Sequence, residues 1–153
     1  MEKWRERFTY EKNELLRREL ELDQRVMDKY DGVIFQVRGW EVSLWSALIV
    51  IIFQFNERPM IYVALLIPPV FWGLDAMYKT YREGYKLRRN KISAFMTSKE
   101  YENSFRKGEM KFATPVFPVH KNRNMLRNAL RPHIFMLHAT LLALTLVTIA
   151  LIF

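Results

Sequence analysis

The sequence predicts an all-α integral membrane protein that crosses the bilayer three times and assembles as a homo-oligomer. Half of its 153 residues are apolar and about a quarter are charged, yet the two classes occupy separate stretches of the chain. Residues 133–153 contain no Lys, Arg, Asp or Glu, whereas the stretch before them is crowded with cations. Such segregation is typical of membrane helices, because charged side chains are costly in hydrocarbon.

Residues 1–39 are predicted to form a cytoplasmic amphipathic helix. Nine basic and nine acidic residues balance there, so this helix is a poor candidate for binding anionic lipid. Its apolar stripe matches the helical period and favours self-association, with packing on the basic segment as the alternative. The members of the stripe are Trp4, Phe8, Leu15, Leu22, Val26, Tyr30, Val33 and Val37.

Residues 40–78 are predicted to form a transmembrane helical hairpin. We expect its first span, 40–55, to direct insertion in place of a cleaved signal peptide, because mostly polar residues precede it. Asn-Glu-Arg-Pro at 56–59 forms a tight turn, and the second span, 60–78, returns antiparallel. Pro68-Pro69 removes two backbone donors and should bend this span, either as a tolerated kink or as a gating hinge.

Residues 79–132 are predicted to form a basic cytoplasmic segment. A helix continues from the second span to about Lys91, and Thr97 to Glu100 resembles a helix N-cap with Glu at the third helical position. After Gly108 the chain is expected to be extended, because Pro115 and Pro118 block regular helix. A short helix at 122–130 then leads into the third span, 133–153, which is long enough to cross a bilayer of ~30 Å.

Orientation follows from the distribution of Lys and Arg. Nine precede the first span, one lies in the 56–59 turn, fourteen lie in residues 76–132, and none follows the third span. The positive-inside rule therefore places the amino terminus and the basic segment in the cytoplasm, and the turn and Phe153 outside the cell inner membrane.

The sequence predicts neither an enzyme nor a cofactor or metal site. There is no cysteine, which excludes disulfides, thiolate catalysis and cysteine-ligated zinc. The three histidines, His120, His133 and His138, are too scattered for a metal site, and no Gly-rich phosphate loop occurs. We expect His133 and His138 to be packing or interface residues.

Polar and helix-breaking residues inside the spans are candidate pore or gating residues, because polar groups in lipid are costly without a partner or water. In an oligomer, some of them would face a shared aqueous path. Alternatively, the two carboxylates lie at headgroup depth and pair with Arg38 or Lys79. The candidates are Glu41, Ser43, Ser46, Pro68, Pro69 and Asp75.

The basic segment interleaves cations with aromatic residues. That composition suits single-stranded nucleic acid or a nucleotide, which needs both stacking and charge neutralisation. The same cations suit anionic lipid headgroups, and composition alone favours lipid. Candidate ligand-binding residues, chosen on charge and position, are Lys86, Arg88, Arg89, Arg106, Lys107, Arg123 and Arg127.

Two motifs carry a family resemblance. Residues 35–40, Phe-Gln-Val-Arg-Gly-Trp, lead into Val42-Ser43-Leu44, and residues 71–76, Phe-Trp-Gly-Leu-Asp-Ala, are followed by Arg82-Glu83-Gly84-Tyr85. This pattern resembles small bacterial three-span membrane proteins of antiphage defence, the channel effectors of Hailong-type systems. The family has Lys where this chain has Arg38, and its motifs are short, although the resemblance covers most of the chain.

The resemblance implies a homotetrameric ion channel that serves antiviral defence by abortive infection. It further implies that a partner nucleotidyltransferase makes short deoxyadenylate oligomers, which hold the channel inactive until phage activity removes them. The basic segment would then be the oligonucleotide sensor and the spans the pore. The rival prediction is a membrane scaffold that recruits a soluble partner through its amino-terminal helix.

Overall fold

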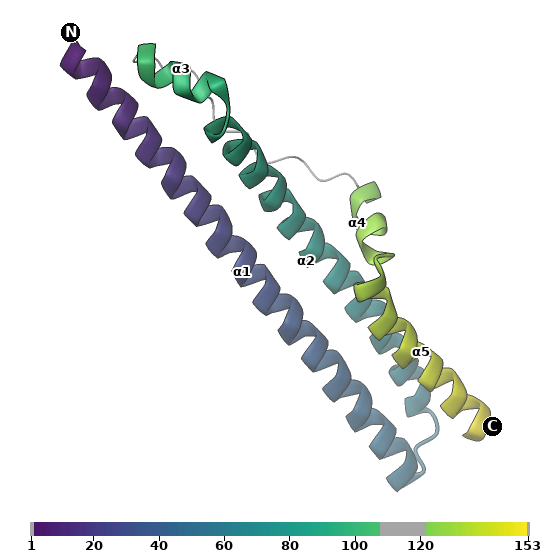
Figure 1. Ribbon diagram of the computed structural model, residues 1–153. Coiled ribbons are helices and arrows are strands. Elements are labelled where there is room, and N and C mark those ends of the chain that lie inside the picture. The colour runs from purple at the N-terminus through teal and green to yellow at the C-terminus, as the bar shows by residue number, and fades with distance from the viewer. Residues whose placement is uncertain (1, 108–121, 153) are drawn as a thin grey trace. The chain divides into compact units, whose positions relative to one another are not determined.

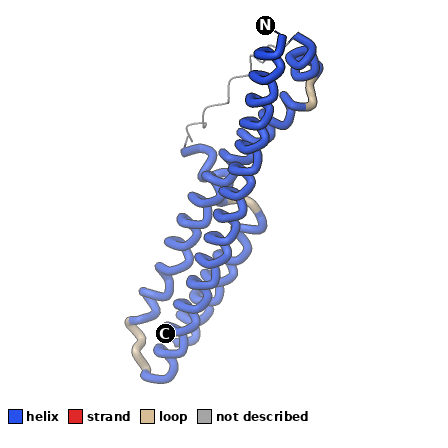
Figure 2. Tube along the Cα trace, turned by 90° about the vertical axis from the view of Figure 1, so that its left-hand side faces the viewer, coloured by secondary structure: helices blue, strands red, loops and turns tan. Residues whose placement is uncertain are grey.

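The computed structural model describes residues 2–107 and 122–152, in which every regular element is an α-helix (Figures 1 and 2). Three of the helices are long and apolar enough to cross a membrane, which confirms the predicted all-α fold with three helices of membrane-spanning length and composition. The helices are α1 (Glu2–Phe55), α2 (Met60–Met96), α3 (Lys99–Lys107), α4 (Asn122–Ala129) and α5 (Pro132–Ile152).

The turn between α1 and α2 lies where the sequence predicts it. Asn56 adopts a left-handed conformation with a φ of 57°, which Asn tolerates better than most residues and which commonly ends a helix. The backbone N–H of Met60 then donates to the carbonyl of Glu57 at 3.0 Å. The chain therefore reverses within four residues, as a membrane hairpin requires.

Pro68 and Pro69 do not interrupt α2, which runs unbroken from Met60 to Met96. Each proline lacks the N–H that would bond the carbonyl four residues earlier, so the helix loses two of its backbone hydrogen bonds at this level. Membrane helices tolerate this because neighbouring groups compensate. Pro68 is buried and Pro69 is exposed.

The helices of the basic segment differ slightly from the prediction. α2 extends to Met96, beyond the predicted end near Lys91. The N-cap of α3 is Ser98 rather than Thr97: the Ser98 Oγ accepts the Tyr101 N–H at 3.2 Å, while the Thr97 hydroxyl bonds back to carbonyls at the end of α2. The predicted extended stretch with Pro115 and Pro118 lies outside the described residues.

The chain divides into two compact units. The first comprises Met1–Lys29 and Arg82–Val119, and Leu16, Ile92 and Phe95 form its apolar core. At this end of α1, Leu15 and Leu22 of the predicted stripe are 60% and 55% exposed, whereas Leu16 and Asp23 are buried. Within one chain these two leucines therefore do not pack on the basic segment, and packing between copies of the chain stays a prediction. The buried face is offset by one residue because its contacts with α2 decide which side chains are covered.

The second unit comprises Tyr30–Tyr81 and His120–Phe153 and contains the apolar parts of α1, α2 and α5. Ile52, Ile61 and Ala64 form its apolar core, and Ile149 and Ile152 of α5 pack against it. Only 17–28% of the most apolar window of each long helix is buried, so most of this apolar surface faces outward. Hydrocarbon chains of a bilayer are the natural environment for such a surface.

Candidate functional site

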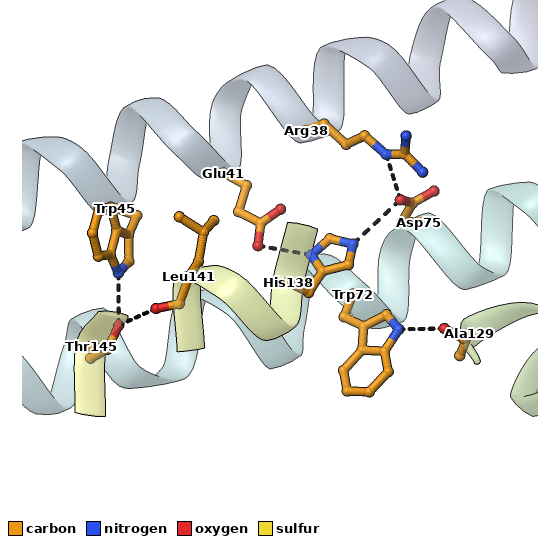
Figure 3. Close-up of polar contacts among 9 residues, drawn as sticks. All are labelled: Arg38, Glu41, Trp45, Trp72, Asp75, Ala129, His138, Leu141 and Thr145. Carbon is orange, nitrogen blue, oxygen red and sulfur yellow. Dashed lines mark hydrogen bonds and ion pairs between the residues drawn. The ribbon is translucent and has the colours of Figure 1, made fainter. Parts of the chain in front are cut away.

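A cluster of four charged or titratable side chains lies inside the second unit, where α1, α2 and α5 meet. Figure 3 shows Arg38 and Glu41 of α1, Asp75 of α2 and His138 of α5 pointing toward one another. The side chains of Glu41, Asp75 and His138 are fully buried, and that of Arg38 is 28% exposed. We call these four residues the buried charge cluster.

His138 is the centre of the cluster. Its Nδ1 lies 2.8 Å from Glu41 Oε1, and its Nε2 lies 3.3 Å from Asp75 Oδ2. Arg38 Nε donates to the same Asp75 Oδ2 at 2.7 Å. Two side chains of α1 and one each of α2 and α5 thus form a continuous chain of charge-assisted contacts, which are stronger than neutral hydrogen bonds.

Trp72 of α2 positions the His138 ring. The two rings stack, with centroids 6.2 Å apart and planes 17° from parallel. The indole N–H of Trp72 donates to the carbonyl of Ala129 at 2.9 Å, which fixes the indole against α4 (Figure 3). The imidazole is therefore held by carboxylates at its edge and by an aromatic face.

A second polar contact joins α1 to α5 farther along both helices. The Trp45 indole N–H donates to Thr145 Oγ1 at 2.7 Å, and this hydroxyl donates to the carbonyl of Leu141 at 2.8 Å (Figure 3). From the Glu41–His138 contact to the Trp45–Thr145 contact, residue numbers increase along both α1 and α5. In this unit α1 and α5 therefore run parallel to each other.

The predicted pore residues fall on opposite sides of the first span. At 100° per residue, Glu41, Trp45 and Ile52 lie on the side that packs against α2 and α5. The opposite side is exposed and carries mostly small or polar residues. We call it the small-polar face, and its members are Gly39, Ser43, Ser46, Ala47, Gln54 and the apolar Val50. Ser43 and Ser46 thus face outward, and Glu41 faces the helix interface together with Asp75.

The pairing expected in the alternative prediction is seen for one of the two carboxylates, and their depth in the membrane stays a prediction. Asp75 pairs with Arg38, as that interpretation expects. Glu41, however, contacts His138, a residue that the sequence predicted only as a packing or interface residue. No motif links these residues, which lie 97 positions apart. The sequence offers one common feature: Glu41, Asp75 and His138 each lie near the end of a span that is predicted to face the cytoplasm.

Arg88 differs from the other predicted ligand-binding cations because it is engaged inside the first unit. It forms an ion pair and hydrogen bond with Glu19, and its Nη1 lies 3.3 Å from Asp23 Oδ1. Asp23 is fully buried, and neither of its carboxylate oxygens has a hydrogen-bond donor among the described residues. Arg88 therefore serves to offset buried carboxylates.

The remaining candidate cations are exposed where the structure describes them. Lys86 and Arg89 lie on α2, and Arg106 and Lys107 lie together in the last turn of α3, all in the first unit. Arg127 of α4 belongs to the second unit. The side chain of Arg123 lies outside the described residues.

Two hollows in the second unit are lined almost entirely by apolar residues. One, of about 360 Å³, is lined by Pro69, Trp72, Gly73, Ala76, Met125, Leu126, Ala129 and Leu130. The other, of about 380 Å³, is lined by Trp40, Ser43, Leu44, Ala47 and Phe71. Within residues 2–107 and 122–152, no group of three His, Asp or Glu side chains is arranged to hold a metal ion.

No protein-family model, no curated protein and no solved structure matches this chain.

Proposed function

We propose that this protein is the subunit of a homo-oligomeric ion channel of a bacterial inner membrane, an effector of antiphage defence. In this proposal the amino terminus and the basic segment are cytoplasmic, the carboxyl terminus lies outside, and a nucleotide or oligonucleotide on the basic segment controls conduction. Four subunits form the channel, in keeping with the family that the sequence resembles.

The small-polar face is the observation that carries this proposal. Ser43, Ser46 and Gln54 are exposed on one side of a span whose other exposed residues are largely apolar. Polar groups that face hydrocarbon lack partners, which is costly. Copies of the chain would relieve that cost by turning these faces toward a shared aqueous path, or toward one another at close-packed helix contacts.

The absence of cysteine makes the proposed pore testable with single-cysteine variants, since each carries one reactive thiol. In liposomes that contain the purified channel, Ser43→Cys and Gln54→Cys should react with a membrane-impermeant thiol reagent, and the reaction should block current. Ile52→Cys is the matched control, because Ile52 lies on the opposite side of α1 and is 2% exposed. Equal reactivity at all three positions would argue against a pore on this face.

Ligand control is tested by charge reversal at exposed cations. Arg89→Glu and Arg106→Glu should abolish the effect of short deoxyadenylate oligomers on current without changing the oligomer size in detergent. These positions are exposed, so their substitution should not disturb packing. Conduction that does not respond to oligonucleotides in the unmodified protein would contradict this form of gating.

A membrane scaffold is the second candidate function. Leu15 and Leu22 are large, exposed apolar residues on the amino-terminal part of α1, where a soluble partner or another copy could cover them. Failure of the reconstituted protein to conduct under any ligand condition, together with recovery of a partner that Leu22→Glu releases, would favour the scaffold over the channel.

A further inference from the structure

The two contacts of the His138 ring cannot both be favourable without an additional proton. A neutral imidazole carries a hydrogen on one nitrogen only. Both ring nitrogens face carboxylate oxygens, at 2.8 Å for Glu41 and 3.3 Å for Asp75. If both carboxylates are ionised and the ring is neutral, one contact sets a nitrogen lone pair against an oxygen lone pair.

The charge of the cluster leads to the same requirement. The Arg38 guanidinium stays charged in proteins. With two ionised carboxylates and a neutral ring, the cluster carries a charge of −1, and one more proton on His138 or a carboxyl group brings it to zero. An uncompensated buried charge is costly, so the extra proton stabilises the packed helices.

No further hydrogen-bond donor among the described residues compensates the negative charge of the two carboxylates. Glu41 Oε2 and Asp75 Oδ1 are buried and have no hydrogen-bond partner among the described residues. Lys79 of α2 and Arg131 lie near His133, on which their charges act together with those of Arg38 and Asp75. Within the cluster, the two carboxylates have only Arg38 and His138 as partners.

We propose that the buried charge cluster is a binding site for one exchangeable proton, and that this proton fastens α5 to the α1–α2 hairpin. The proton comes from water and returns to water, so no other reactant takes part. When it leaves, the buried site carries a charge of −1 and one ring contact becomes repulsive, which loosens α5 at this level. The proposal does not depend on whether the protein conducts ions.

The direct test is NMR of the full chain, labelled with ¹⁵N at histidine, in lipid nanodiscs at pH 7. His138→Gln identifies the His138 signals. Two protonated ring nitrogens support the proposal. So does one protonated nitrogen accompanied by an infrared band of a protonated carboxyl group that Glu41→Gln or Asp75→Asn removes. One protonated nitrogen with no such band would overturn it.

Charge-balanced variants separate the proton from general packing effects. Glu41→Gln removes one negative charge, so its cluster is neutral without the extra proton, and its His138 ring should carry a single N–H. His138→Gln leaves a charge of −1 and should lower the thermal midpoint, whereas Glu41→Gln with His138→Gln leaves only the Arg38–Asp75 pair and should regain at least half of that loss. A double variant less stable than the single one would contradict the proposal.

The stability of the protein should fall as the pH rises, and Glu41→Gln should weaken this dependence. The folded cluster holds a proton that an unfolded histidine releases near pH 6.5, so the unmodified protein should lose stability as the pH rises above that value. Glu41→Gln should show a clearly flatter dependence. Identical slopes for the two proteins would overturn the proposed site.

Discussion

Replacing Arg88 with Gln should destabilise the first unit because the carboxylates of Glu19 and Asp23 would lose the cation that contacts both of them. Removing one partner of a fully buried ion pair costs about 3–5 kcal/mol. Here Asp23 is 0% exposed, but the side chains of Arg88 and Glu19 are 18% and 33% exposed, so water screens part of the effect. We therefore expect the free energy of local opening to fall by about 2–3 kcal/mol.

The penalty of Arg88→Gln should also depend on pH. Burial raises the pKa of the Asp23 carboxyl above its usual value of 3.8, and the positive charge of Arg88 opposes this rise. Without Arg88 the pKa of Asp23 should rise further. A raised folded-state pKa gives stability that is present below the unfolded value and is lost as pH rises through the folded one. The variant should therefore lose less stability near pH 4 than at neutral pH.

Hydrogen exchange measured by mass spectrometry on peptides from residues 13–29 and 84–96 would test this reasoning. Arg89→Gln is the matched control, because Arg89 is the exposed neighbour and should change stability by less than about 0.5 kcal/mol. Equal exchange in both variants, or a penalty for Arg88→Gln that is the same at both pH values, would refute the structural role of Arg88.

Three further substitutions test other contacts. Ile92→Ala should lower the local opening free energy of the first unit by about 2–5 kcal/mol in the same exchange assay, because Ile92 is fully buried; exchange unchanged from the parent would contradict that core. Ser98→Ala should destabilise α3 by about 1 kcal/mol and speed amide exchange at Tyr101, because the Tyr101 N–H loses the Ser98 hydroxyl as its acceptor. Exchange at Tyr101 equal to that of the parent would contradict this cap. Thr145→Val should cost about 1 kcal/mol in detergent unfolding followed by circular dichroism, since the Trp45 indole loses its acceptor, and a stability equal to the parent's would show that this bond contributes nothing.

The elements of the fold could be predicted because their signals are local. A run of apolar residues of bilayer length identifies each span, and Asn56 with Pro59 marks the turn between two of them. The face of a long helix is less predictable, because its partner helix selects it. This explains why Leu16 rather than Leu15 is buried.

The buried charge cluster could not be predicted as a site, although the sequence predicts two of its residues, Glu41 and Asp75, as pore or gating residues. Glu41 and Asp75 attract attention as carboxylates inside spans, but their shared partner, His138, lies on a third helix. Only the antiparallel hairpin and the parallel placement of α5 bring the three residues to one level. Likewise, Arg88 resembles its exposed neighbours in sequence and differs from them only through its contacts in the first unit.

The stacking of Trp72 on His138 provides an intrinsic optical signal. Aromatic faces attract cations, and a protonated imidazole quenches the fluorescence of an indole that it touches. With ring centroids 6.2 Å apart, the emission of Trp72 should brighten when His138 becomes neutral. Comparing the emission of the parent with that of Trp72→Phe would isolate this signal from the other three tryptophans without attaching any dye.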